Sequence, residues 1–165
     1  MSDASHRLLL LRHAKSSWDE PELADHDRPL APRGRRAAKR MARYLRDEQT
    51  EVALVLCSSA VRARQTLERV QPAGEIQIEP ALYGAGADQL LERLAQVGGE
   101  TESVMLIGHN PALEDLTTLL AHGAPLAGEK FPTGALATLR FSGSWAELGP
   151  GRAELVSFVR PRELD

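Results

Sequence analysis

Cysteine is almost absent from this 165-residue chain, in which Cys57 is the single one. One cysteine cannot form an intrachain disulfide, and this usage is typical of proteins kept in a reducing compartment. Residues 1–7 are polar, and the leucine run that follows them is too short for the apolar core of a signal peptide. We therefore expect a cytoplasmic protein.

Long apolar runs and a strong excess of one charge are also missing. The longest apolar stretches span only a few residues, which argues against a transmembrane helix. Arginines are frequent between residues 33 and 46, but aromatic residues make up only 4% of the chain and its formal net charge is -3. Nucleic-acid-binding proteins are usually basic and interleave cations with aromatic side chains. We expect neither a membrane nor a nucleic acid as a partner.

The chain does have the composition of a globular domain, with 42% hydrophobic and 26% charged residues. A chain of this length can bury a sizeable core without disulfides or metals. No internal repeat, linker or low-complexity segment divides it. Residues 1–165 are accordingly expected to form a single domain.

Short apolar runs alternate with segments in which apolar residues recur every three or four positions. The runs predict strands buried on both faces, and the periodic segments predict amphipathic helices. The predicted strands are 8–11, 52–56, 76–78, 104–107, 135–141 and 154–159, and the predicted helices are 33–46, 60–70, 87–97 and one that begins at Pro111 with Asn110 as N-cap. The last two strands are expected to be antiparallel at the sheet edge. This alternation indicates an α/β layered fold.

Anion-binding side chains follow three of the predicted strands. Arg12 and His13 come after the first, Arg62 lies soon after the second, and His109 follows the strand at 104–107. The carboxyl ends of parallel strands share one edge of a sheet, which is where ligands bind in open α/β folds. Two arginines, two histidines and the amino ends of the following helices would form the oxyanion pocket that phosphoryl transfer requires. The pattern predicts an enzyme that acts on phosphate groups.

Two alternative sites fit the spacing less well. Cys57 and Arg62 are separated by one residue fewer than in the phosphate loop of cysteine phosphatases, so Cys57 is expected to be a small buried hydrophobe. The histidines offer no pair at a metal-ligand spacing, and we expect no metal. They are His6, His13, His26, His109 and His122.

Several motifs together carry a family resemblance. Arg12-His13 after an apolar strand, the segment Ser-Ser-Ala-Val-Arg-Ala-Arg-Gln-Thr at 58–66 and Gly-His-Asn at 108–110 resemble the histidine phosphatase superfamily, whose fold is phosphoglycerate-mutase-like. The short length and the motifs at 11–18, 27–34, 107–111 and 131–135 look like its SixA branch of phosphohistidine phosphatases. The resemblance covers nearly the entire chain.

The resemblance implies a three-layer sandwich, with a mostly parallel sheet and helices on both faces, and a role for each site residue. His13 matches the nucleophile that accepts the phosphoryl group, Arg12 and Arg62 match the arginines that grip its oxygens, and His109 matches the second histidine of the pocket. Cations beside His13 disfavour its protonated form, which agrees with a nucleophilic role. Lys15 is a further candidate for substrate binding, and neither a metal nor an organic cofactor is expected.

No residue is a clear match for a general acid, and the lack of a clear match affects which substrate we expect. Members that cleave phosphate esters have an acidic residue after the strand that follows the second helix; here Glu79 is a candidate, and Asp27 in the long loop at 16–33 is another. A phosphoramidate nitrogen leaves more readily than an alkoxide and depends less on such an acid. We therefore expect a phosphatase that removes the phosphoryl group of phosphohistidine on a signalling protein, through an intermediate on His13. The alternatives are a phosphatase of small phosphate esters and a non-catalytic phosphoprotein-binding module.

Overall fold

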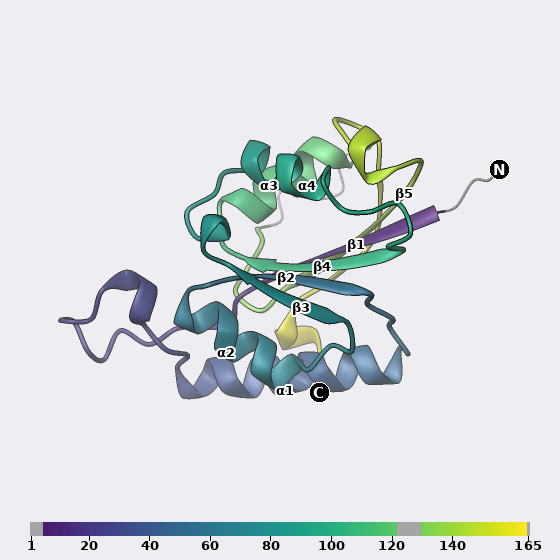
Figure 1. The fold of residues 1–165 in the computed structure, drawn as a ribbon. Coiled ribbons are helices and arrows are strands. Elements are labelled where there is room, and N and C mark those ends of the chain that lie inside the picture. Colours follow the sequence, from purple (N-terminus) through teal and green to yellow (C-terminus); the bar gives the residue numbers. More distant parts are fainter. Residues whose placement is uncertain (1–4, 122–129, 165) are drawn as a thin grey trace.

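The computed structural model describes residues 5–121 and 130–164, which are built around one six-stranded sheet (Figure 1). The strands are β1 (Ser5–Arg12), β2 (Leu54–Ser58), β3 (Glu75–Glu79), β4 (Ser103–Gly108), β5 (Leu136–Ser142) and β6 (Glu154–Val159), in the order β3-β2-β4-β1-β5-β6. β3, β2, β4 and β1 run parallel, β5 is antiparallel to β1, and β6 is antiparallel to β5. The predicted α/β class and the antiparallel pair on one side of the sheet are confirmed.

Helices cover both faces of this sheet, which confirms the three-layer arrangement (Figure 1). The helices are α1 (Pro32–Asp47), α2 (Val61–Val70), α3 (Ala87–Leu94) and α4 (Ala112–Leu120), and single 3₁₀ turns lie at Asp25–Asp27, Pro80–Leu82, Trp145–Glu147 and Pro161–Glu163. α1 and α2 pack on one face and α3 and α4 on the other. No helix in the described ranges is both long enough and apolar enough to cross a membrane.

The leucine run of β1 divides between the two layers of the core. Leu8 and Leu10 pack in the cluster that includes α3 and α4, whereas Leu9 and Leu11 pack in the cluster that includes α1 and α2. All four side chains are at most 1% exposed. Because successive residues of a strand point to opposite faces, a central strand covered on both faces needs such a continuous apolar run. Arg12, the last residue of this strand, and His13 therefore lie at the carboxyl edge of the sheet.

The start of α4 differs from the prediction by one residue. Pro111 precedes the helix, which begins at Ala112. Asn110 does not cap from the adjoining position; its Oδ1 accepts the Glu114 N–H at 3.2 Å while its amide donates to the Phe131 carbonyl at 3.0 Å. The Asn110 side chain is therefore shared between the helix end and a neighbouring segment.

Other boundaries shift for reasons of backbone hydrogen bonding. β2 extends through Ser58, because this residue still pairs with Glu79 of β3. α3 ends at Leu94 and not near Val97, since the backbone after it tightens into a three-residue turn in which Val97 N–H donates to Leu94 O at 3.1 Å.

The long loop after β1 is closed at its base by backbone pairing of Ser16 with Leu30. Arg28 is buried beneath it and donates to Ser16 Oγ at 2.9 Å and to Ser17 O at 3.0 Å. Trp18 is 68% exposed and its ring stacks on the Arg28 guanidinium. The loop is thus anchored along its length, which positions the 3₁₀ turn at Asp25–Asp27.

Candidate active site

The four anion-binding side chains predicted at the sheet edge do meet there. β1 and β4 are parallel neighbours with Arg12 opposite Gly108, so the residues that follow each strand are adjacent. The rings of His13 and His109 lie with centroids 5.1 Å apart. Arg62, in the first turn of α2, places its Nε 3.4 Å from His13 Nε2.

The orientation of His13 is fixed through its Nδ1 atom. This nitrogen lies 2.8 Å from the Ala14 carbonyl oxygen, which can only accept, so Nδ1 carries the proton. In the neutral ring Nε2 then keeps an unprotonated lone pair, which accepts a long hydrogen bond from Arg62 Nε. The backbone is held as well, because His13 N–H donates to Gly108 O and Ala14 N–H donates to Thr66 Oγ1.

The electrostatic surroundings keep both pocket histidines neutral. The pKa of His13 is lowered to about 3, mainly by burial; the neighbouring His109, Arg62 and Arg12 act in the same direction, and the Ala14 hydrogen bond opposes them. Burial and then Arg62 lower the pKa of His109 to about 4. A neutral imidazole beside two guanidinium groups can act as a nucleophile at pH 7.

The ring of His109 is positioned by Ser58, the last residue of β2. Its Nε2 lies 2.8 Å from Ser58 Oγ, and this oxygen also accepts the Ala60 N–H at 3.2 Å. The ring of Tyr83 approaches its edge at a centroid distance of 5.6 Å. His109 Nδ1 is buried and has no hydrogen-bond partner among the described residues, so it is a polar atom that a bound ligand could satisfy.

Arg12 is anchored to the backbone of residue 131. Its Nη1 donates to Phe131 O at 2.8 Å, and the Phe131 N–H donates to Glu114 Oε1 at 3.2 Å. Burial lowers the pKa of Arg12, and the nearby Glu114 charge opposes this effect. Arg12 Nε is buried without a partner in the described part of the chain, which leaves donor capacity for an anion.

Asp25 is the residue at this site that sequence reasoning missed. Arg62 donates to the Asp25 carbonyl oxygen at 2.7 Å and to its Oδ2 at 2.9 Å, Tyr83 donates to the same Oδ2 at 2.6 Å, and Arg28 donates to Oδ1 at 3.2 Å. The Tyr83 hydrogen bond is the largest cause of a strongly lowered pKa of Asp25, followed on the lowering side by Arg62. Only the loop conformation distinguishes Asp25 from the other acids of this segment.

The two sequence-predicted candidates for a general acid lie in other contacts. Both oxygens of Glu79 accept hydrogen bonds of 2.8 Å from Arg93, in a bidentate ion pair. Asp27 is exposed, and its Oδ1 lies 3.4 Å from His26 Nδ1. Within the described residues no hydrogen bond or ion pair joins either carboxylate to His13, Arg12, Arg62 or His109.

Other predicted residues take structural positions. Cys57 is fully buried and burial raises the pKa of its thiol to about 12, which confirms it as a packed hydrophobe. Arg64 is exposed and its Nε donates to Ser59 O at 2.9 Å. His6 stacks on Phe141 and lies edge-on to Trp145.

The other described histidine, His26, lies in contacts of its own. His26 Nε2 lies 2.8 Å from Ser59 Oγ and its ring meets Tyr83 edge-on, whereas His122 lies outside the described residues. Across 5–121 and 130–164, no three His, Cys, Asp or Glu side chains gather in a way that could hold a metal ion.

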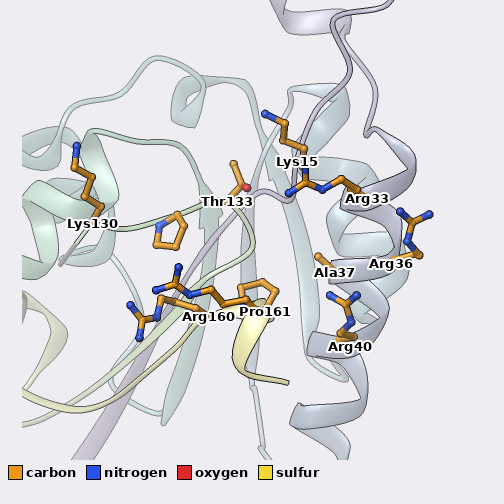
Figure 2. A pocket seen from close by; sticks show the side chains of 11 residues that line it. Lys15, Arg33, Arg36, Ala37, Arg40, Lys130, Thr133, Arg160 and Pro161 are labelled. Atoms are coloured by element: carbon orange, nitrogen blue, oxygen red, sulfur yellow. The ribbon is translucent and has the colours of Figure 1, made fainter. Parts of the chain in front are cut away.

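Lys15 follows the pocket and faces a separate hollow. Its backbone packs against Gly34 of α1, where an added Cβ would lie 2.1 Å from the Lys15 carbonyl oxygen. Only glycine permits this approach of helix and loop. The exposed Lys15 side chain lines a groove that it shares with arginines of α1 (Figure 2).

Comparison with known proteins agrees with this geometry. Residues 8–85 match the model of the histidine phosphatase superfamily, branch 1. A protein from Mycobacterium tuberculosis is 42% identical over 159 residues, which cover 92% of this chain and 100% of that protein. The chain belongs to the histidine phosphatase superfamily, and this membership supports a phosphatase.

Solved structures narrow the comparison to one branch. A protein from Nakamurella multipartitia assigned as a phosphohistidine phosphatase SixA is 32% identical, with a TM-score of 0.88 over 97% of this chain and 99% of that one. The protein histidine phosphatase SixA complexed with tungstate is 25% identical, with a TM-score of 0.79 over 95% of this chain and 98% of that one. Both of these structurally similar proteins are described as SixA phosphohistidine phosphatases.

Proposed function

We propose that this protein removes the phosphoryl group of phosphohistidine on a partner protein, through a covalent intermediate on His13 Nε2. The observation that carries the proposal is the tautomer of His13. Its Nδ1 proton is committed to the Ala14 carbonyl, so the ring presents an unprotonated Nε2 beside Arg62. The SixA neighbour solved with tungstate, an oxyanion with the shape of phosphate, supports the same use of the pocket.

In the first step, Nε2 of His13 attacks phosphorus while the substrate's P–N bond breaks. The electron pair of that bond stays with the departing imidazole nitrogen, which leaves as a neutral ring when the substrate ring carries a proton. Arg12 and Arg62 neutralise the equatorial oxygens, where negative charge accumulates in the transition state. These fixed cations supply the charge stabilisation, so the proposed step uses no metal and no organic cofactor.

In the second step, water attacks the phosphoryl group on His13. The new O–P bond replaces the Nε2–P bond, the electron pair returns to Nε2, and the water proton leaves with the released phosphate or solvent. His109 lies beside His13 and is neutral, so it can hold a phosphate oxygen or the attacking water by hydrogen bonding. Lys15, exposed two residues beyond His13, would help to bind the substrate.

The carboxylates near the pocket favour phosphoramidate over ester substrates. An alkoxide must be protonated as it leaves, which needs a carboxyl group that holds a proton at neutral pH. Asp25 has a strongly lowered pKa and is ionised, and Glu79 is bound by Arg93. A protonated phosphohistidine ring needs no such donor. Because phosphohistidine occurs on signalling proteins of the cytoplasm, the proposed substrate would place this enzyme in the cytoplasm.

The direct test compares turnover of a phosphohistidine-bearing protein with turnover of a small phosphate ester, in chelator, with His13→Ala as the control. We expect faster cleavage of the phosphoramidate and no turnover by the variant. Preferential cleavage of the ester would keep the His13 chemistry and reject the substrate class. Binding of phosphate without turnover of either compound would identify a phosphoprotein-binding module.

A further inference from the structure

A groove of about 800 Å³ lies next to the candidate active site, and seven of its eleven lining residues are cations (Figure 2). α1 contributes Arg33, Arg36 and Arg40, and the C-terminal segment contributes Arg160 and Arg162. Lys15 and Lys130 line it from two further segments, and none of its eleven lining residues is acidic. Residues that are far apart in sequence therefore bring one sign of charge to one hollow.

Most of the cations of this groove have no ion pair within the described residues. Glu163 forms an ion pair with Arg160 at 2.9 Å, and it lies near Arg162 as well. Among the described residues, no ion pair involves Lys15, Lys130 or the three groove arginines of α1. Arg36 and Arg40 are four residues apart on one helix, a spacing at which like charges repel each other. An anionic occupant would relieve this repulsion.

A single short segment, residues 131–134, lies between the groove and the pocket of His13. Phe131 O accepts the hydrogen bond from Arg12, and Gly134 N–H donates to His13 O at 3.0 Å. Pro132 and Thr133, which lie between these two residues, line the groove. A chain that placed a phosphorylated side chain at His13 would therefore have the groove as its neighbouring surface.

The dimensions of the groove match an extended peptide. Arg40 lies seven positions after Arg33 on the helix, a rise of about 10 Å, which equals roughly three residues of extended chain. One phosphate group would be held by two or three of these cations, so the full set is suited to several anions spaced along a chain. Ala37, Pro132 and Pro161 add apolar surface between the cations, against which the carbon atoms of a peptide can pack.

We propose that this groove docks an acidic segment, rich in Asp and Glu, of the phosphorylated protein whose phosphoryl group is delivered to His13. The proposal rests on the proposed function for the identity of its substrate. The acidic segment would raise encounter rate and specificity, and the pocket of His13 would perform the chemistry.

The experiment uses two phosphohistidine peptides, with flanking glutamates in one and flanking glutamines in the other. The groove variant is Arg33→Glu with Arg40→Glu. The control is Lys39→Glu with Arg46→Glu, which makes the same change in net charge on the same helix but outside the groove. Because each exposed charge pair contributes only modestly and several act together, we expect a roughly tenfold preference in kcat/KM for the acidic peptide, lost in the groove variant and retained in the control.

Two further readouts separate this proposal from the proposed function. A small phosphoramidate should be hydrolysed at the same rate by both variants and the wild type; if no form hydrolyses it, the proposed function fails. Binding of an unphosphorylated glutamate peptide, measured by fluorescence anisotropy, needs no catalysis and should weaken only in the groove variant. Equal binding by both variants would overturn the docking proposal. In a competition experiment, displacement of the bound peptide by far less inorganic tripolyphosphate than by a second acidic peptide would overturn it as well.

Discussion

Acidification should destabilise this protein in a way that reports directly on the two pocket histidines. The pKa of His13 is lowered to about 3 and that of His109 to about 4, whereas an unfolded chain has histidine pKa values near the ordinary 6.5. Between those limits the unfolded state binds a proton at each residue and the folded state does not. The free energy of unfolding therefore rises with pH over this window and falls as pH decreases below 6.5.

The magnitude follows from the number of protons. Each histidine contributes up to about 1.4 kcal/mol per pH unit, so the two together contribute at most about 2.7 kcal/mol per unit near pH 5.5. His13→Asn removes one of these protons, and its amide can still donate to the Ala14 carbonyl. We expect the variant to lose about half of the wild-type slope.

The assay is urea denaturation at several pH values from 5 to 7, where most carboxylates remain ionised in both states. Equal slopes for the wild type and His13→Asn would refute the reasoning. A wild-type stability that does not change below pH 6.5 would refute it as well, because it would mean that the buried imidazoles accept protons without cost.

Three further predictions test single residues. Asp25→Asn removes the carboxylate that Arg62, Arg28 and Tyr83 share. Since this side chain is 48% exposed, we expect only a roughly fivefold loss in kcat/KM, measured with the phosphohistidine peptide. An unchanged kcat/KM would show that Arg62 does not need the Asp25 carboxylate. Gly34→Ala gains up to about 1 kcal/mol of helix propensity, but the added Cβ would lie 2.1 Å from Lys15 O. We therefore expect a net destabilisation of about 2 kcal/mol, seen as a lower Tm. A higher Tm would contradict this expectation. Glu79→Gln should leave turnover of both substrate classes within about twofold, because Arg93 binds both oxygens, and a selective loss with the ester would identify Glu79 as the acid.

The sequence predicts the parts of this fold that depend on local pattern. The leucine run of β1 requires two covered faces, and the end of that run necessarily places Arg12 and His13 at the carboxyl edge. His109 follows β4 in the same way, so parallel pairing of the two strands brings both histidines together.

Features that depend on loop conformation are not predictable in the same way. Asp25 reaches Arg62 because the loop after β1 is held by Arg28 and by the pairing of Ser16 with Leu30, and no periodicity marks it among the neighbouring acids. The tautomer of His13 likewise depends on the position of one backbone carbonyl. The basic groove combines side chains of separate segments, of which only the arginines of α1 form a visible sequence cluster.

The central claim is that Nε2 of His13 carries the phosphoryl group during turnover. The most direct measurement is rapid quenching of the enzyme with a phosphohistidine substrate in base, followed by mass spectrometry to locate the phosphorylated residue and ³¹P NMR to assign the ring nitrogen. The account predicts phosphate on Nε2 of His13, absent in His13→Ala. Phosphate on Nδ1, phosphate on His109, or continued turnover by His13→Ala would contradict it.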